Sequence, residues 1–368
     1  MFPLELPFAT QFYLDLYVVT FVVHLLLMFY VFAGTFHLAV FGGAESTTAA
    51  GRINETVRDW LPFALSAAIT AGIAPLLFIQ LLYQFDYYTA NVLLSHRWMS
   101  ILPILIVAFY GLYLLKMKLF VKTRPWLDRL IACFVFLCIL YVGYTFSENH
   151  LLSVQSKTVW ATHYASGRIF YWTSEILPRV ATILGQAFSS TAIVWYWQIS
   201  MQQRQKQQEI PQDLPRRLAY LSTAGLIISL VAFIYYCLAV SKNWYPGNST
   251  DEASQLLKQP YIYLYVCGLF FQIWWWATIA IDPQRISFAS WFLAGASALT
   301  LLMGAMVREQ YRVSRIVTDN LLQLHQHHLM AEGKWLFLAF TIIHTLLICW
   351  LIYVTRKAIH ASVQQTKR

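Results

Sequence analysis

The sequence predicts an all-α, polytopic integral membrane protein with about nine transmembrane helices. Hydrophobic residues occupy 58% of its 368 positions and charged residues only 12%. Apolar stretches of roughly 20 residues, enough to cross about 30 Å of hydrocarbon as a helix, follow one another along the chain. We expect spans near Phe12–Phe41, Leu61–Phe85, Trp98–Leu115, Leu130–Phe146, Ile176–Ile199, Leu218–Val240, Tyr261–Ile281, Phe288–Val307 and Trp335–Tyr353.

Short polar connections separate these spans in order. A basic cluster, Lys116–Arg129, joins the third and fourth spans, and another, Arg204–Arg217, joins the fifth and sixth. The sixth and seventh spans are joined by Ser241–Pro260. Single prolines interrupt the second span at Pro75 and the third at Pro103, and they are expected to kink their helices.

The distribution of basic residues predicts the orientation. If the N-terminus lies outside, 16 of the 26 basic residues fall on the cytoplasmic side, as the positive-inside rule favours. We therefore expect a bacterial inner-membrane protein with its N-terminus outside and its C-terminus in the cytoplasm. No lysine or arginine precedes the first long apolar run, so this run is expected to be a retained span and not a secretory signal.

Three segments are expected along the chain. Residues 1–147 would form an N-terminal four-helix bundle, and residues 148–307 a second one. Residues 308–368 would contain an outer basic and histidine-rich loop, the ninth helix and a cytoplasmic tail.

Charge and cysteine content exclude several functions. The net charge of +9 reflects basic residues in short connections between spans, which argues against nucleic-acid binding. The chain has no Cys-x-x-Cys-His sequence for a c-type haem and no Cys-x-x-Cys pair for zinc or iron–sulfur ligation. Phosphate-binding glycine loops are also absent from the sequence, which argues against an ATP-driven pump.

Histidines within apolar spans are the first candidates for a functional site. His24, His37 and His344 lie inside spans, where ionisable side chains are costly and usually functional. In an electron-transfer membrane protein such a histidine typically ligates haem iron, and Met303 or Met306 could supply a second axial bond. His24 and His37 are separated by about 20 Å along one helix and therefore cannot share a haem. The alternative is that each histidine is a polar group hydrogen-bonded to a neighbouring helix.

Carboxylates are confined to span ends and loops. No aspartate or glutamate lies in the middle of an apolar run. A membrane oxidase that reduces oxygen commonly brings protons to its site along intramembrane carboxylates. The sequence thus favours electron transfer without oxygen chemistry.

A basic stripe follows the eighth span. Arg308, Arg312 and Arg315 are spaced four and three residues apart, so a continuing helix would hold them on one face. We expect this outer surface to bind a quinol headgroup, a haem propionate, a partner cytochrome or lipid phosphate. The histidines His325, His327 and His328 are expected to belong to the same surface.

The first two spans resemble cytochrome bd quinol oxidase subunit I. The resemblance is carried by Leu16–Gly34, with His24 in an aliphatic and aromatic setting, and by Phe63–Gly72, followed by Gln80. It implies nine spans with the N-terminus outside and a haem ligated by His24. The chain departs from the family in its short Ser241–Pro260 connection, in a third span without glutamate, and in a fifth span without histidine near Pro178. These departures imply a relative without oxygen-reducing chemistry.

The sequence therefore predicts a membrane subunit of a respiratory electron-transfer complex. It would exchange electrons between quinol or quinone and an extracytoplasmic c-type or multihaem cytochrome, through one haem b. Two alternatives stay open. The chain could be a haemless scaffold that anchors cytochrome subunits, or a transporter in which the membrane histidines line a proton or metal path.

Overall fold

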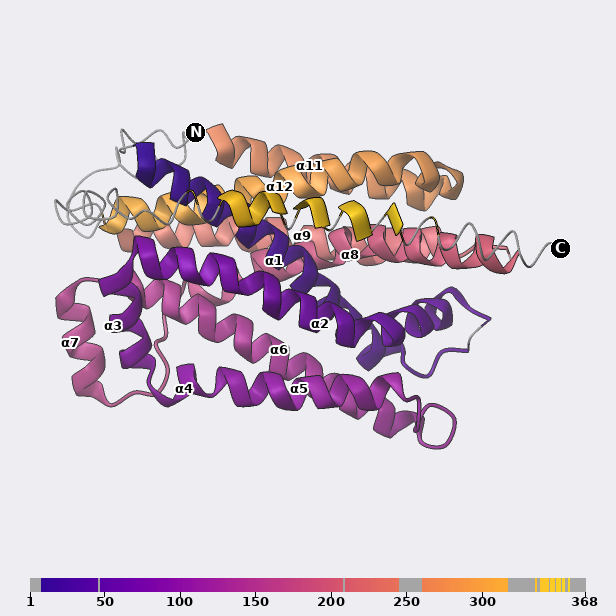
Figure 1. The fold of residues 1–368 in the computed structure, drawn as a ribbon, viewed down its shortest axis with the longest axis horizontal. Helices are drawn as coiled ribbons and strands as arrows, with labels where there is room; N and C mark the ends of the chain where they lie inside the picture. Colours follow the sequence, from indigo (N-terminus) through magenta and orange to yellow (C-terminus); the bar gives the residue numbers. More distant parts are fainter. Residues whose placement is uncertain are drawn as a thin grey trace. The chain divides into compact units, whose positions relative to one another are not determined.

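The computed structural model describes residues 8–45, 47–207, 209–244, 260–316 and, with gaps, 335–357. All regular structure in these residues is helical (Figure 1). The elements are α1 Phe8–Phe41, α2 Ala49–Leu82, α3 Gln84–Leu94, α4 His96–Met99, α5 Ile101–Lys116, α6 Pro125–Ser153, α7 Lys157–Ser166, α8 Ile176–Lys206, α9 Leu214–Trp244, α11 Pro260–Ile281, η1 Pro283–Arg285 and α12 Ile286–Ile316.

Seven of the described helical segments are long and apolar enough to cross a membrane. They contain α1, α2, α4 with α5, α6, α9, α11, and η1 with α12. The chain is thus an all-helical, multi-pass membrane protein, as the composition predicts. The ninth predicted span is described with gaps, as an apolar helix within Leu338–Leu351 together with Trp335 and Tyr353.

Two units divide the chain. Residues Thr10–Val317 form one compact unit, apart from a second unit made of Leu6–Ala9 and Thr318–Arg368. Within the first unit, α8 packs against α9, and α11 packs against both α9 and α12. Helix α6 packs against α5, α3 and α8, while α2 packs against α5.

Helix α8 corresponds to the fifth predicted span but is more polar than the other long helices. Its small polar side chains contact two neighbouring helices. Ser189 donates a hydrogen bond to Gln272 of α11 at 2.9 Å, and Ser190 lies 2.7 Å from Ser297 of α12. Hydrogen bonds of this kind join helices in an apolar medium, where the hydrophobic effect does not drive them together. The polarity of α8 therefore reflects its central contacts.

Two glycines let α8 and α9 approach closely. A Cβ atom on Gly185 would lie 2.5 Å from the Gly225 carbonyl oxygen, and the converse distance is also 2.5 Å. Only hydrogen fits at either position. Small residues at helix crossings are typical of membrane proteins for this reason.

Helix boundaries follow local sequence signals. The Thr48 side chain accepts a hydrogen bond from the Gly51 amide at the start of α2, and Pro125 occupies the first turn of α6. Pro75 lies inside α2, where it removes one backbone donor. Pro103 is the third residue of α5, so it lies in the first turn of that helix, directly after the turn at Ser100 that separates α4 from α5.

Candidate functional site

An apolar cavity of about 360 Å³ opens among α1, α2, α5 and α6. Residues of α8 and one residue of α12 complete its lining. Most of the wall is aliphatic or aromatic, with Ile101, Val142 and Phe146 on the α5 and α6 side. The hydrogen-bonding or charged side chains on the wall are few: His24, Ser147 and Arg308. A mostly apolar cavity with a few convergent polar groups is the usual form of a cofactor site.

His24 lines this cavity, and a hydrogen bond defines its tautomer. It lies near the middle of α1, and its Nδ1 is 2.8 Å from the carbonyl oxygen of Ala68 on α2. Because a carbonyl only accepts hydrogen bonds, Nδ1 carries the proton and donates it. The lone pair is therefore on Nε2, which is the nitrogen left for a ligand.

Gly72 makes the position of the His24 ring possible. A Cβ atom at Gly72 would lie 2.8 Å from His24 Nδ1 and 2.9 Å from its Cε1. Those distances are shorter than a van der Waals contact, so any larger residue would displace the imidazole. One turn of α2, from Ala68 to Gly72, thus both orients the ring and makes room for it.

These residues fit a haem with a single histidine ligand. A metal-ligating histidine usually donates its other N–H to a carbonyl or carboxylate, which fixes its tautomer and ring orientation. His24 has that arrangement, and the aliphatic walls suit a porphyrin plane. The cavity wall opposite α1 offers Ser147 but no histidine or methionine, while Met28 lies one turn from His24 on the same helix.

His37 has different surroundings. Its ring is fully buried, and its Nδ1 lies 2.9 Å from Asn54 Oδ1 on α2. The Asn54 amide in turn donates to the Phe41 carbonyl at 2.6 Å, and Trp195 packs edge-on at 5.4 Å between ring centroids. Nε2 has no hydrogen-bond partner among the described residues, but His37 lines neither of the cavities described here. The hydrogen bond to Asn54 links α1 to α2.

The structure does not place the other predicted site residues beside His24. Met303 and Met306 are buried on α12, and neither lines the cavity that contains His24. The remaining predicted site histidines, His344, His325, His327 and His328, lie outside the described residues.

The arginines of the predicted stripe lie on one helix, but Arg312 is not exposed at the protein surface. Helix α12 continues to Ile316 and so includes all three arginines, although the side chain of Arg315 lies outside the described part. Arg312 is 1% exposed, pairs with Glu309 at 3.5 Å, and lies 4.8 Å from the Tyr83 ring. Arg308 donates to the Tyr17 hydroxyl and lies over the Phe21 ring at 4.5 Å. The expectation that Arg312 forms an outer docking surface is therefore wrong, because this face of α12 packs against other helices.

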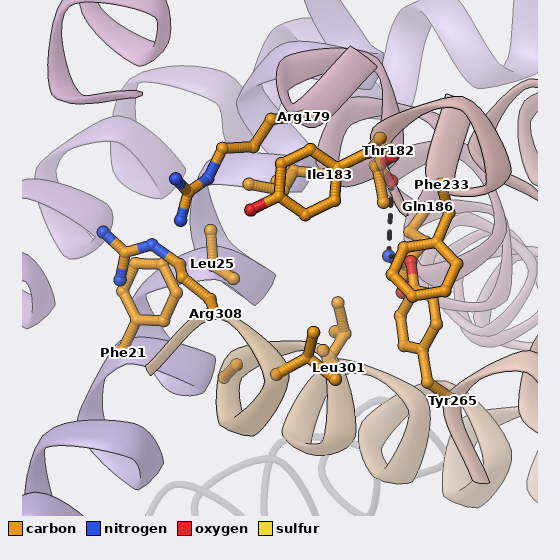
Figure 2. A pocket seen from close by; sticks show the side chains of 14 residues that line it. Phe21, Leu25, Arg179, Thr182, Ile183, Gln186, Phe233, Tyr265, Leu301 and Arg308 are labelled. Atoms are coloured by element: carbon orange, nitrogen blue, oxygen red, sulfur yellow. Dashed lines mark hydrogen bonds between the residues drawn. The ribbon is translucent and has the colours of Figure 1, made fainter. Parts of the chain in front are cut away.

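Another buried arginine, Arg179 of α8, lies near the half-buried Arg308. Both line a second cavity of about 60 Å³, and their guanidinium groups point toward one another in Figure 2. Arg179 donates to His150 Nε2 at 3.4 Å. Sequence reasoning missed Arg179, although an arginine at the start of an otherwise apolar span was a usable signal.

The carboxylates Glu309 and Glu175 contact residues other than Arg179 and Arg308. Glu309 pairs with Arg312, and Glu175 accepts a hydrogen bond from the Tyr311 hydroxyl at 3.0 Å. Asp86 on α3 is half-buried; burial raises its pKa, and the Arg312 charge acts in the opposite direction. Among the described residues, no carboxylate forms an ion pair with Arg179 or Arg308.

The described residues contain no group of three or more histidine, cysteine, aspartate or glutamate side chains that could hold a metal ion. A haem, which takes four of its ligands from the porphyrin, needs only one or two protein ligands. Comparison with known proteins finds no matching family model and no matching curated protein.

Proposed function

We propose that this chain is a b-type haem subunit of a bacterial respiratory membrane complex that exchanges electrons between quinol or quinone and an extracytoplasmic c-type cytochrome. One observation carries the proposal. His24, near the middle of a membrane helix, lines an apolar cavity, and its hydrogen bond from Nδ1 to a backbone carbonyl leaves Nε2 unprotonated. An imidazole that only joined two helices would not need a cavity beside it.

A haem in this cavity would supply one-electron chemistry. His24 would hold its iron, and the Ala68 carbonyl would keep the imidazole in the ligating tautomer. The walls from α5 and α6 would exclude water from the porphyrin plane. Arg308 would place a positive charge at one end of the same cavity.

The choice of partners rests on the resemblance of the first two spans to cytochrome bd quinol oxidase subunit I. That resemblance supports quinol as the electron donor or quinone as the acceptor. Because Arg312 is buried, other residues would have to bind a cytochrome or lipid. His325, His327 and His328 of the predicted outer loop are the remaining candidates.

The reduced-minus-oxidised spectrum of the purified full-length chain tests the proposal. We expect a b-type α-band and about one protohaem per chain by pyridine haemochrome, as one histidine ligand implies. A chain that contains no haem after expression with excess haem precursor would contradict the proposal and favour a scaffold.

Gly72→Ala is expected to weaken haem retention without unfolding the protein. The added Cβ would displace the His24 imidazole from its hydrogen bond to Ala68. Loss of such a supporting interaction costs about 10- to 100-fold in metal affinity. Haem content and the Soret maximum are the measurements. Gly295→Ala is the matched control, since its Cβ would meet nothing within 4 Å, and equal effects of the two variants would argue against a role for the His24 ring position.

The proposed orientation predicts a labelling pattern. Tyr164, on α7, and Gln207, at the end of α8, are both exposed and lie at opposite ends of the long helices. With the N-terminus outside, Tyr164→Cys should react with an impermeant maleimide in intact cells, whereas Gln207→Cys should react only after lysis. The reverse pattern would invert the topology.

A further inference from the structure

Arg179 and Arg308 form a pair of like charges, and neither forms an ion pair with a carboxylate among the described residues. They come from different helices, α8 and α12, and face one another across the small cavity (Figure 2). Arg179 is 5% exposed, and its Nη1 has no hydrogen-bond partner among the described residues. Tyr236, on the same cavity wall, has a buried hydroxyl that is also without a partner there.

These groups are all donors. A guanidinium group has no acceptor atom, and a tyrosine hydroxyl can donate its proton. Burying two cations side by side is strongly unfavourable unless an anion lies between them. Glu309 pairs with Arg312 at 3.5 Å and Glu175 accepts a hydrogen bond from Tyr311, so neither carboxylate forms an ion pair with Arg179 or Arg308.

The small cavity adjoins the large apolar one. Phe21, Leu25, Ile183 and Arg308 line both. A molecule with an anionic head at the arginines could therefore extend an apolar body toward His24.

We propose that Arg179, Arg308 and Tyr236 form a buried site for a carboxylate or phosphate group that belongs to a largely apolar molecule. Arginine pairs bind such groups bidentately and with defined geometry. Two sources share this chemistry, namely a carboxylate edge of the haem and the headgroup of an anionic lipid. The first source rests on the proposed function, whereas the anion site itself does not.

The first arm of the test uses haem-free full-length protein in detergent, titrated with haemin and with haemin dimethyl ester, which lacks free carboxylates. Soret absorbance reports the binding. If the anion is a haem carboxylate, the wild type should bind haemin at least about tenfold more tightly than the ester, because a charge-assisted bond is lost. Arg179→Gln and Arg308→Gln should each reduce that preference to about twofold or less.

The second arm measures phosphorus per chain after detergent delipidation, and the thermal midpoint in nanodiscs of phosphatidylglycerol or phosphatidylcholine. If the anion is a lipid phosphate, the wild type should retain phospholipid and be more stable in phosphatidylglycerol, and both variants should lose these properties. Arg216→Gln removes an exposed arginine and serves as the control in both arms. Arg308→Lys keeps the charge without the bidentate geometry and should give an intermediate result.

The outcomes are distinguishable. Unchanged haemin preference together with unchanged phosphorus content and lipid dependence in both glutamine variants would overturn the anion site. Binding of neither haemin nor its ester would remove the proposed haem function, and the phosphorus arm alone would then decide the anion site.

Discussion

Replacing His24 by glycine should abolish haem binding. Removing only a supporting partner of a ligating histidine costs about 10- to 100-fold in metal affinity, so removing the ligand itself should cost at least roughly 100-fold. The structure offers no substitute histidine on the cavity wall, within the residues that it describes. We therefore expect the Soret band and the pyridine haemochrome signal of purified His24→Gly to fall to background.

Three comparisons make this result specific. Added imidazole should restore a Soret band in His24→Gly, because the small ligand can occupy the space of the missing ring. His37→Ala should keep its haem, since His37 is bonded to Asn54 and lines no described cavity. Cys133→Ala changes an exposed residue of α6 and should also leave the spectrum unchanged. Full haem content in His24→Gly would falsify the ligand assignment.

The transmembrane character could be predicted from sequence because it depends on local composition. Each long apolar stretch must satisfy its own backbone hydrogen bonds in lipid, and a helix does so irrespective of its neighbours. Seven of the first eight predicted spans coincide with helical segments long and apolar enough to cross a membrane, although Trp98–Leu115 is divided by a turn at Ser100. The fifth coincides with α8, which is not among these seven. Helix α8 shows the limit of this reasoning, since its polar residues are explained by partners that are 83 to 107 residues away.

The candidate site could be predicted only in part. His24 and His37 look alike in sequence, since both are histidines in an apolar run. Their difference arises from α2, which offers a carbonyl and a glycine to one ring and Asn54 to the other. Similarly, the spacing of Arg308 and Arg312 correctly predicts one helix, but spacing does not say whether that face meets water or α1 and α8. Arg179 could be recognised as a partner of Arg308 only after the helices were packed.

A different pair of charged residues should control the stability of the fold. Arg58 of α2 donates two hydrogen bonds to Asp128 of α6, at 2.8 and 2.5 Å. It also reaches the carbonyl oxygens of Leu115 at 3.3 Å and Gly42 at 3.5 Å. Both charged residues are 2% exposed. One guanidinium group therefore joins α2 to the start of α6 and to the chain at the C-terminal ends of α1 and α5.

Arg58→Met should destabilise the protein strongly. It leaves the Asp128 carboxylate buried without its partner, and breaking a buried ion pair from one side typically costs about 3–5 kcal/mol. Denaturant-induced unfolding in mixed micelles, followed by tryptophan fluorescence, measures this loss. Arg285→Met is the matched control, because its pair with Asp282 is exposed and should contribute no more than about 1 kcal/mol.

The double variant Arg58→Met/Asp128→Leu tests whether the unpaired Asp128 carboxylate causes the loss of stability in Arg58→Met. Replacing a whole buried ion pair by apolar residues of similar volume is often neutral or stabilising, because the desolvation cost of both ions disappears. We therefore expect the double variant to be more stable than Arg58→Met alone, which identifies the unpaired carboxylate as the cause of the single variant's loss. If the double variant is instead no more stable than Arg58→Met, the unpaired carboxylate is not the cause of the loss. The carbonyl contacts of Arg58 to Leu115 and Gly42 then account for it, and the guanidinium group acts mainly as a cap on the ends of α1 and α5.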